Sequence, residues 1–145
     1  MKFISSSYNP KTGKSEVIMQ HLGVKFKGYA QLHPEDRENE SNFAGCYLAE
    51  LRAKILALRY ERYLAKKKSD DANDFMKSCE NYTAFDPESS TAKAMYRQIN
   101  RRIKKVNDIT DEINNLLNEI DIAKRRRQIV LNAIKRNKEK SKEDK

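Results

Sequence analysis

Hydrophobic residues recur along most of the chain at the spacing of one helix face, which predicts helices after residue 41. From Leu48 to Ala65 they alternate steps of three and four residues, the spacing of a coiled-coil stripe. The same alternation runs from Met95 to Ile134, and such a repeat favours a left-handed supercoil with a partner helix. The predicted fold class is mainly α: a long antiparallel helical hairpin or coiled coil with a small N-terminal β-hairpin.

The start of the chain shows the signals of strands and turns instead. Residues 2–7 and 15–21 have strand composition and flank residues 9–13, which contain the turn formers Asn, Pro and Gly. Residues 24–29 extend a third short strand after Gly23. Because an isolated hairpin is marginal in water, we expect this sheet to pack on a helix.

These patterns divide the chain into three parts. We predict an N-terminal β-hairpin and polar connection in residues 1–40, a helical coiled-coil region in 41–136, and a disordered basic tail in 137–145. Ser41 or Asn42 is the expected cap of the first helix.

Two interruptions are predicted within the helical region. Ser69 followed by two aspartates is typical of a helix cap with acids in the next first turn, so a short second helix is expected there. Its expected apolar face consists of Phe75, Met76, Cys79 and Tyr82. Asp86 and Pro87 should end it, and Ser89 or Ser90 should begin the last helix. The first helix would then be roughly 40 Å long and the last roughly 70 Å.

This difference in length predicts an apolar stripe on the last helix that the first helix cannot cover. Each buried aliphatic group contributes about 1.5–3 kcal/mol of transfer free energy, so a fully solvated stripe is unfavourable. Three surfaces could bury this stripe: the same stripe of a second copy, the chain's own N-terminal sheet, or a different protein. The stripe assigned to a partner or a second copy consists of Ile113, Leu116, Leu117, Ile120, Val130 and Ile134.

The charge of the chain adds a second feature to the last helix. The net charge is +9, which favours acidic partners such as nucleic acid, an acidic protein surface or anionic lipid. Residues 89–145 hold sixteen Lys and Arg against eight Asp and Glu. The clusters predicted to contact nucleic acid or an acidic partner are Arg97, Arg101, Arg102, Lys104 and Lys105, and then Lys124, Arg125, Arg126 and Arg127.

Two interpretations of these clusters remain open. Their centres lie roughly 35 Å apart along a helix, about one turn of duplex DNA, which is compatible with phosphate contacts. Alternatively, they form a solvated face whose cations pair with the acids between them. The basic residues are not interleaved with aromatic residues in the manner of single-strand binders.

Candidate chemistry is sparse in this sequence. His21, His33, Cys46 and Cys79 include no close pair with the spacing of metal ligands, and no glycine-rich phosphate loop occurs. The acids after His33 are interpreted as capping chemistry, and Glu50 and Arg52 as partners in surface or interhelical salt bridges. We therefore expect no catalytic, metal or cofactor site.

No apolar run approaches the roughly 18 residues of a membrane span, and the N-terminus does not resemble a signal peptide. The expected location is the cytoplasm, with no membrane partner.

Four short segments in the N-terminal part of the chain form a pattern: Phe26–Ala30, His33–Asp36, Gly45-Cys46 and Ala49–Ala53. The pattern is a short β-hairpin, an HP(E/D)D turn and a helix that begins GC…AE.RA, and it covers about residues 1–60. This part of the chain resembles a group of small, uncharacterised phage and prophage proteins of Gram-positive bacteria. The resemblance implies no catalytic motif, and it implies a phage context, in which small proteins often bind and block host machines such as CRISPR effectors.

Two functions are expected from these observations. The first is a non-enzymatic phage protein that inhibits a host defence nucleoprotein complex, such as a CRISPR effector, by direct binding in the host bacterial cytoplasm. The second is a dimeric coiled-coil phage protein that binds DNA or has a structural role. The expected partners are a host protein or nucleoprotein complex, DNA or RNA, and a second copy of the chain.

Overall fold

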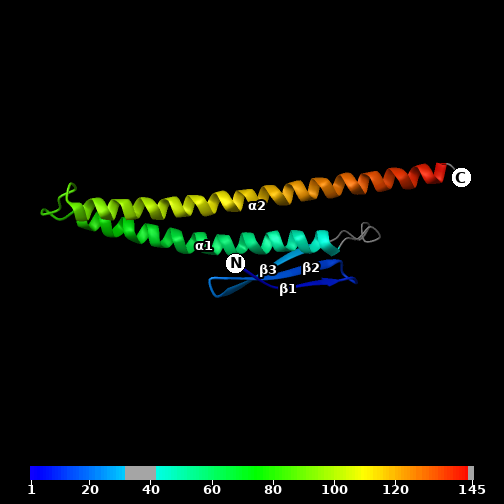
Figure 1. The fold of residues 1–145 in the computed structure, drawn as a ribbon, viewed down its shortest axis with the longest axis horizontal. Helices are drawn as coiled ribbons and strands as arrows, with labels where there is room; N and C mark the ends of the chain where they lie inside the picture. Colours follow the sequence, from blue (N-terminus) through cyan, green and yellow to red (C-terminus); the bar gives the residue numbers. More distant parts are fainter. Residues whose placement is uncertain (32–41, 144–145) are drawn as a thin grey trace. The chain divides into compact units, whose positions relative to one another are not determined.

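The computed structural model describes residues 1–31 and 42–143. A three-stranded sheet is followed by two long helices, so the protein is mainly helical (Figure 1). The strands are β1 (Lys2–Asn9), β2 (Lys14–His21) and β3 (Val24–Gln31), and the helices are α1 (Asn42–Glu80) and α2 (Ser90–Glu143). No helix in the described ranges combines the length and the apolar character needed to cross a bilayer.

The chain divides into two compact units that share both helices. Unit 1 comprises Met1–Ala57 and Asn114–Lys145, and unit 2 comprises Leu58–Ile113. Unit 1 therefore holds the sheet, the first part of α1 and the second part of α2. Unit 2 holds the remainder of both helices and the turn that joins them.

The sheet of unit 1 is an antiparallel meander in the order β1-β2-β3, as the strand and turn signals predicted. Leu22 and Gly23, which form the tight turn between β2 and β3, have φ values of 51° and 76°. Positive φ at both central positions matches the twist of a two-residue hairpin, and glycine adopts it without steric cost. A register shift between Phe3 and Ser5 interrupts the pairing of β1 with β2.

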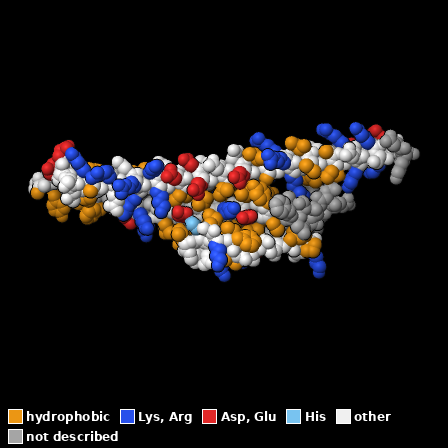
Figure 2. All heavy atoms as spheres, in the orientation of Figure 1, with side chains coloured by type: hydrophobic (Ala, Val, Ile, Leu, Met, Phe, Trp, Pro, Cys, Tyr) orange, Lys and Arg blue, Asp and Glu red, His pale blue; other side chains and the backbone are white. Residues whose placement is uncertain are grey.

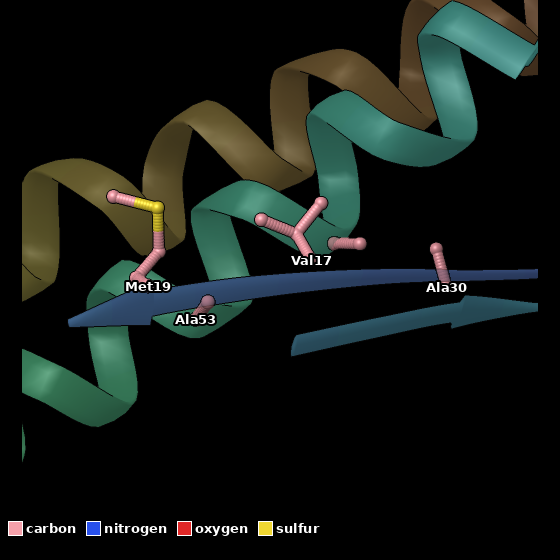
Figure 3. Packing of buried hydrophobic residues seen from close by; sticks show 5 residues of the cluster. Val17, Met19, Ala30 and Ala53 are labelled. Carbon is pink, nitrogen blue, oxygen red and sulfur yellow. The ribbon is translucent and has the colours of Figure 1, made fainter. Parts of the chain in front are cut away.

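One face of the sheet packs on α1, which confirms the expectation that the sheet needs a helix. Val17 and Met19 from β2 point toward α1, where Ala53 faces them (Figure 3). Ala30 of β3 and Ala49 of α1 complete this buried cluster. The alanines on the helix leave room for the larger β2 side chains, so the helix lies close to the sheet.

Gly28 and Gly45 permit an even closer approach at two points. A Cβ atom on Gly28 would lie 1.9 Å from the main-chain oxygen of Ala49 and 2.5 Å from the nitrogen of Ala53. A Cβ atom on Gly45 would lie 2.5 Å from the Ser15 hydroxyl oxygen. The backbone of β3 thus touches the backbone of α1, and any side chain at Gly28 would force them apart.

Helix α1 is continuous for 39 residues, so the interruption predicted at Ser69 is wrong. Ser69 is buried, and with Ala65 and Met76 it continues the inward face of the helix at helical spacing. Burial of that face stabilises the helix more than a cap would, since capping contributes only about 1 kcal/mol. The predicted stop at Asp86 and Pro87 is also wrong, because α1 already ends at Glu80.

The segment between the helices forms consecutive turns. The amide of Tyr82 donates to the carbonyl of Cys79, and the amide of Phe85 donates to the carbonyl of Tyr82. The side chain of Ser89 accepts a 3.2 Å hydrogen bond from the amide of Ala92, which confirms the predicted cap of the last helix.

Helix α2 extends to Glu143, beyond the end predicted at residue 136. The sequence predicted a disordered tail from 137 because that segment is polar and lacks an apolar face. Its residues include Lys and Glu, which are good helix formers, and the cations Lys140 and Lys142 lie in the last turn, where they interact favourably with the helix dipole.

Candidate functional site

The first basic cluster lies on the part of α2 that belongs to unit 2, and it is not uniformly presented to solvent. Arg97, Arg101, Lys104 and Lys105 are exposed. Arg102 is partly buried, and its Nη1 donates a 3.0 Å hydrogen bond to the main-chain oxygen of Lys68 on α1. Arg102 therefore links the two helices, whereas its exposed neighbours can contact a partner.

The core of unit 2 shows why Arg102 turns inward. Met76 of α1 packs with Ala92 and Ile99 of α2, and Arg102 follows Ile99 at the next position of the same face. Nearby, the Tyr96 hydroxyl donates a 2.7 Å hydrogen bond to Glu80. The carboxylate of Glu80 favours the protonated phenol, so the hydrogen bond raises the pKa of Tyr96 above its usual value of 10.0.

The second basic cluster lies on the part of α2 that belongs to unit 1 and shows the same division. Lys124, Arg125 and Arg126 are exposed. Arg127 is partly buried, and its Nη2 is shielded from solvent without a hydrogen-bond partner in the described part of the chain. Arg127 occupies a position of the inward stripe, which explains why it differs from the three residues before it.

The predicted apolar stripe is divided between the interior and the surface. Ile113 and Ile120 are buried within the chain, and Leu116 and Ile134 are partly buried. Leu117 is exposed. The periodicity thus identified the inward face of α2, but much of this face is already covered by the chain itself.

The stripe also changes its register near its end. Val130, predicted to lie on the stripe, is 57% exposed, whereas its neighbour Leu131 is 6% exposed. After Arg127 the inward face takes a second step of four residues, because an α-helix drifts relative to a strict heptad repeat. The prediction that Val130 lies on the inward stripe is wrong, because it continued the heptad repeat with a step of three after Arg127.

Sequence reasoning missed an apolar group on the opposite face of the same helix segment. Ile122 and Ile129 are exposed, and Arg125 and Arg126 lie between them. Figure 2 shows Lys and Arg side chains beside apolar ones along this part of α2. The signal was present in the sequence, since the two isoleucines are one heptad apart, but neither was assigned to a surface of its own.

Sequence reasoning also missed the exposed aromatic residues of unit 2. Phe75 and Tyr82 lie at the end of the unit where the two helices are joined, and both are exposed. Phe75 was expected on the buried face of a short second helix. The continuous α1 turns Met76 inward instead, which leaves Phe75 in solvent.

The polar residues flanking the sheet-facing side of α1 have structural roles. Glu50 pairs with Lys54 at 3.3 Å, which confirms the salt bridge expected for Glu50. Arg52 forms no salt bridge with a described residue; its Nη1 donates a 2.6 Å hydrogen bond to the main-chain oxygen of Tyr29. Arg52 thus links α1 to the backbone of β3 by a hydrogen bond.

A shallow polar depression of about 410 Å³ lies at the β1–β2 turn of the sheet. The ammonium of Lys14 lies 4.1 Å from the centre of the Tyr29 ring next to it, a cation–π geometry. The residues that line the depression are Ser7, Tyr8, Asn9, Pro10, Thr12, Lys14 and Glu16.

Among the described residues, no group of three or more His, Cys, Asp or Glu side chains is placed to bind a metal ion. Cys46 and Cys79 are partly buried free thiols. The segment 33–36, considered in the sequence as a turn with acids after His33, lies outside the described residues.

Comparisons of the chain with protein-family models, with curated proteins and with solved structures found no match.

Proposed function

We propose that this chain is a non-enzymatic phage-type protein that inhibits a host defence nucleoprotein complex, such as a CRISPR effector, by binding it directly. The observation that carries the proposal is the outward display of cations on α2. Arg97, Arg101 and Lys104 are exposed in unit 2, and Lys124, Arg125 and Arg126 are exposed in unit 1. None of these forms an ion pair with a described residue.

A nucleoprotein complex suits such a surface because it presents both phosphate groups and acidic protein residues. Cations that contact phosphate release condensed counterions, which supplies much of the binding free energy at low salt. A helix also fixes the backbone that carries these side chains before binding, so only the side chains themselves need to be ordered.

The phage context and the site of action rest on the resemblance of residues 1–60 to phage and prophage proteins. Within this proposal the protein acts in the cytoplasm of the host bacterium.

We further propose that α1 and α2 form a long antiparallel hairpin with coiled-coil packing. In unit 1 the Tyr47 hydroxyl lies 3.5 Å from Glu119, and in unit 2 Arg102 bonds to Lys68, so contacts join the two helices in each unit. The buried and partly buried positions of α2 follow alternating three- and four-residue steps up to Arg127, which supports the same arrangement.

Recovery of a partner from host cells tests the proposed inhibition. The tagged protein is incubated with lysate of a Gram-positive host, and bound proteins and nucleic acids are identified before and after nuclease treatment. We expect a defence nucleoprotein complex to be retained by the wild type and lost from Arg125→Glu/Arg126→Glu. Recovery of no nucleoprotein complex, or of the same one by both proteins, would contradict the proposal.

The exposed cations also support a second candidate, a dimeric DNA-binding or structural phage protein. If these cations contact phosphate, the affinity for duplex DNA should fall steeply as salt is added. Reversing the charge of Arg125 and Arg126 should lower that affinity and reduce its dependence on salt. Absence of any DNA binding at low salt would exclude this candidate.

A further inference from the structure

The part of α2 in unit 1 carries an outward face formed by Ile122, Arg125, Arg126 and Ile129, which we call the outer face. These residues are separated by steps of three, one and three, so they lie together on a helix surface. Ile122 is 41% exposed and Ile129 is 67% exposed, while Ile120 and Leu131 of the same helix are buried. The outer face is therefore apolar at both ends and cationic between them.

The surroundings of the outer face restrict what can cover it. Residues 122–142 contain nine Lys and Arg, and Glu139 is their one acid. A cover that brings further cations would be repelled. A suitable cover has carboxylates to meet the arginines and apolar or aromatic groups to meet the isoleucines.

The chain itself carries a surface of this kind in unit 2, which we call the acidic tip. Its aromatic residues are Phe75 and Tyr82, which are 62% and 72% exposed. Between Ser69 and Ser90 the only base is Lys77. The acids of the tip are Asp70, Asp71, Asp74, Glu80, Asp86 and Glu88.

Not all carboxylates of the acidic tip are equally available. Glu80 accepts the hydrogen bond of Tyr96, Glu88 pairs with Lys93 at 3.2 Å, and Asp86 accepts from the amide of Glu88. Asp71 and Asp74 are exposed, and Asp71 precedes Phe75 by one helical turn. Figure 2 shows acidic and apolar side chains at this end of the unit, with Lys and Arg side chains beside them.

We propose that two copies of this chain associate reciprocally, with the acidic tip of each seated on the outer face of α2 of the other. The surfaces are opposite in charge, and each exposes large apolar groups that the other can cover. Because every copy carries both surfaces, a twofold arrangement forms the contact twice and closes without free ends. Exposed Phe, Tyr and Arg residues are also those enriched at the cores of protein interfaces.

This association goes beyond inhibition of a host complex, since it requires only the purified protein. Because both use Arg125 and Arg126, the dimer contact and the contact with a host complex are alternatives at these side chains. The association also differs from self-association through the inward stripe of α2, because Ile120 of that stripe is buried within the chain. The two surfaces that meet belong to different copies, and each is complete within one unit.

A charge-swap experiment tests the proposal. The face variant, Arg125→Glu/Arg126→Glu, has an acidic tip and an acidic face. The tip variant, Asp71→Lys/Asp74→Lys, keeps the basic face and carries cations at the two exposed acidic positions next to Phe75. Sedimentation equilibrium at about 100 µM detects dimers with micromolar Kd. We expect wild-type dimers that weaken with salt, and about tenfold or greater weakening in each variant alone.

An equal mixture of the two variants should restore dimers, because both contacts then join opposite charges. Lys25→Glu/Lys27→Glu makes the same change in net charge at exposed positions of β3, outside both surfaces, and should leave association unaltered. Circular dichroism and the urea midpoint verify that each variant is folded before it is scored.

Three outcomes would overturn the proposal. The first is a wild-type protein that stays monomeric at low salt. This outcome counts against the proposal even if Arg125 and Arg126 bind an added DNA duplex. Another is dimerisation of each folded variant with unchanged Kd. The third is a mixture of the folded variants that remains monomeric.

Discussion

Arg102 donates a hydrogen bond from its Nη1 to the main-chain oxygen of Lys68, so one member of a basic cluster joins the two helices of unit 2. Its neighbour Arg101 is exposed. The two arginines are adjacent in sequence but lie about 100° apart around the helix. The helix period, rather than the charge, therefore decides which cation faces a partner and which faces the interior.

This difference predicts that two alanine substitutions have unequal effects on the free energy of unfolding. Arg102→Ala should lower the free energy of unfolding by about 1 kcal/mol, because a hydrogen bond and the packing of the side chain are lost. Arg101→Ala should leave it unchanged within about 0.5 kcal/mol, as is usual for an exposed site. Urea denaturation followed by circular dichroism measures both. Equal effects of the two substitutions would refute the assigned roles.

Gly28 provides a test of the contact between the sheet and α1. Gly28→Ala should destabilise the protein by about 3 kcal/mol or more, because the new Cβ overlaps the backbone of Ala49 and Ala53. Gly23→Ala is the matched control: no atom lies within 4 Å of its Cβ, and only its positive φ opposes the change. We expect a cost of about 1 kcal/mol there. A Gly28→Ala protein as stable as the control would argue against the close packing.

The general fold was predictable because it depends on local periodicity. Strand composition on both sides of the turn formers in residues 9–13 predicted the sheet, and the three- and four-residue steps predicted the inward faces of both helices. The close approach at Gly28 was not predictable, since it depends on which helix residue lies opposite. The continuity of α1 through Ser69 also depends on tertiary burial, which outweighs a local capping signal.

The candidate site was predictable to a lesser extent. Counting charges located the basic clusters on α2, and Arg101, Lys124, Arg125 and Arg126 are exposed as a contact surface requires. Charge alone could not separate Arg127 from Arg126, because that depends on the phase of the helix after residue 120. The exposed Phe75 was missed for a related reason, since its orientation depends on α1 continuing without a break.

Proline at position 70 distinguishes a continuous α1 from two successive helices. If Ser69 capped a new helix, Asp70 would occupy its first position, where proline is favourable. In a continuous helix, Asp70→Pro removes an internal hydrogen bond and clashes with the preceding turn, at a cost of about 3 kcal/mol or more. We expect a lower urea midpoint and reduced helicity. Unchanged stability would show that the helix is interrupted at Ser69.

The hydrogen bond between Tyr96 and Glu80 predicts a pH dependence. The pKa of Tyr96 is raised in the folded state. The contribution of its hydrogen bond to stability is therefore fully present below about pH 10 and is lost as the pH rises through the folded-state pKa. The difference in urea midpoint between wild type and Tyr96→Phe should therefore shrink above about pH 10. In a Glu80→Gln background the same comparison should show little dependence on pH. A constant difference in the wild-type background would contradict this linkage.

Inhibition of a purified defence complex tests the central claim most directly. A guide-loaded CRISPR effector from a Gram-positive host is mixed with increasing amounts of the protein, and cleavage of target DNA is measured. We expect saturable inhibition by the wild type, about tenfold or greater weakening for Arg125→Glu/Arg126→Glu, and wild-type inhibition for Arg102→Ala after correction for its folded fraction. Full cleavage at saturating protein across the host's effector complexes, or equal inhibition by the charge-reversed variant, would contradict the proposed role of α2.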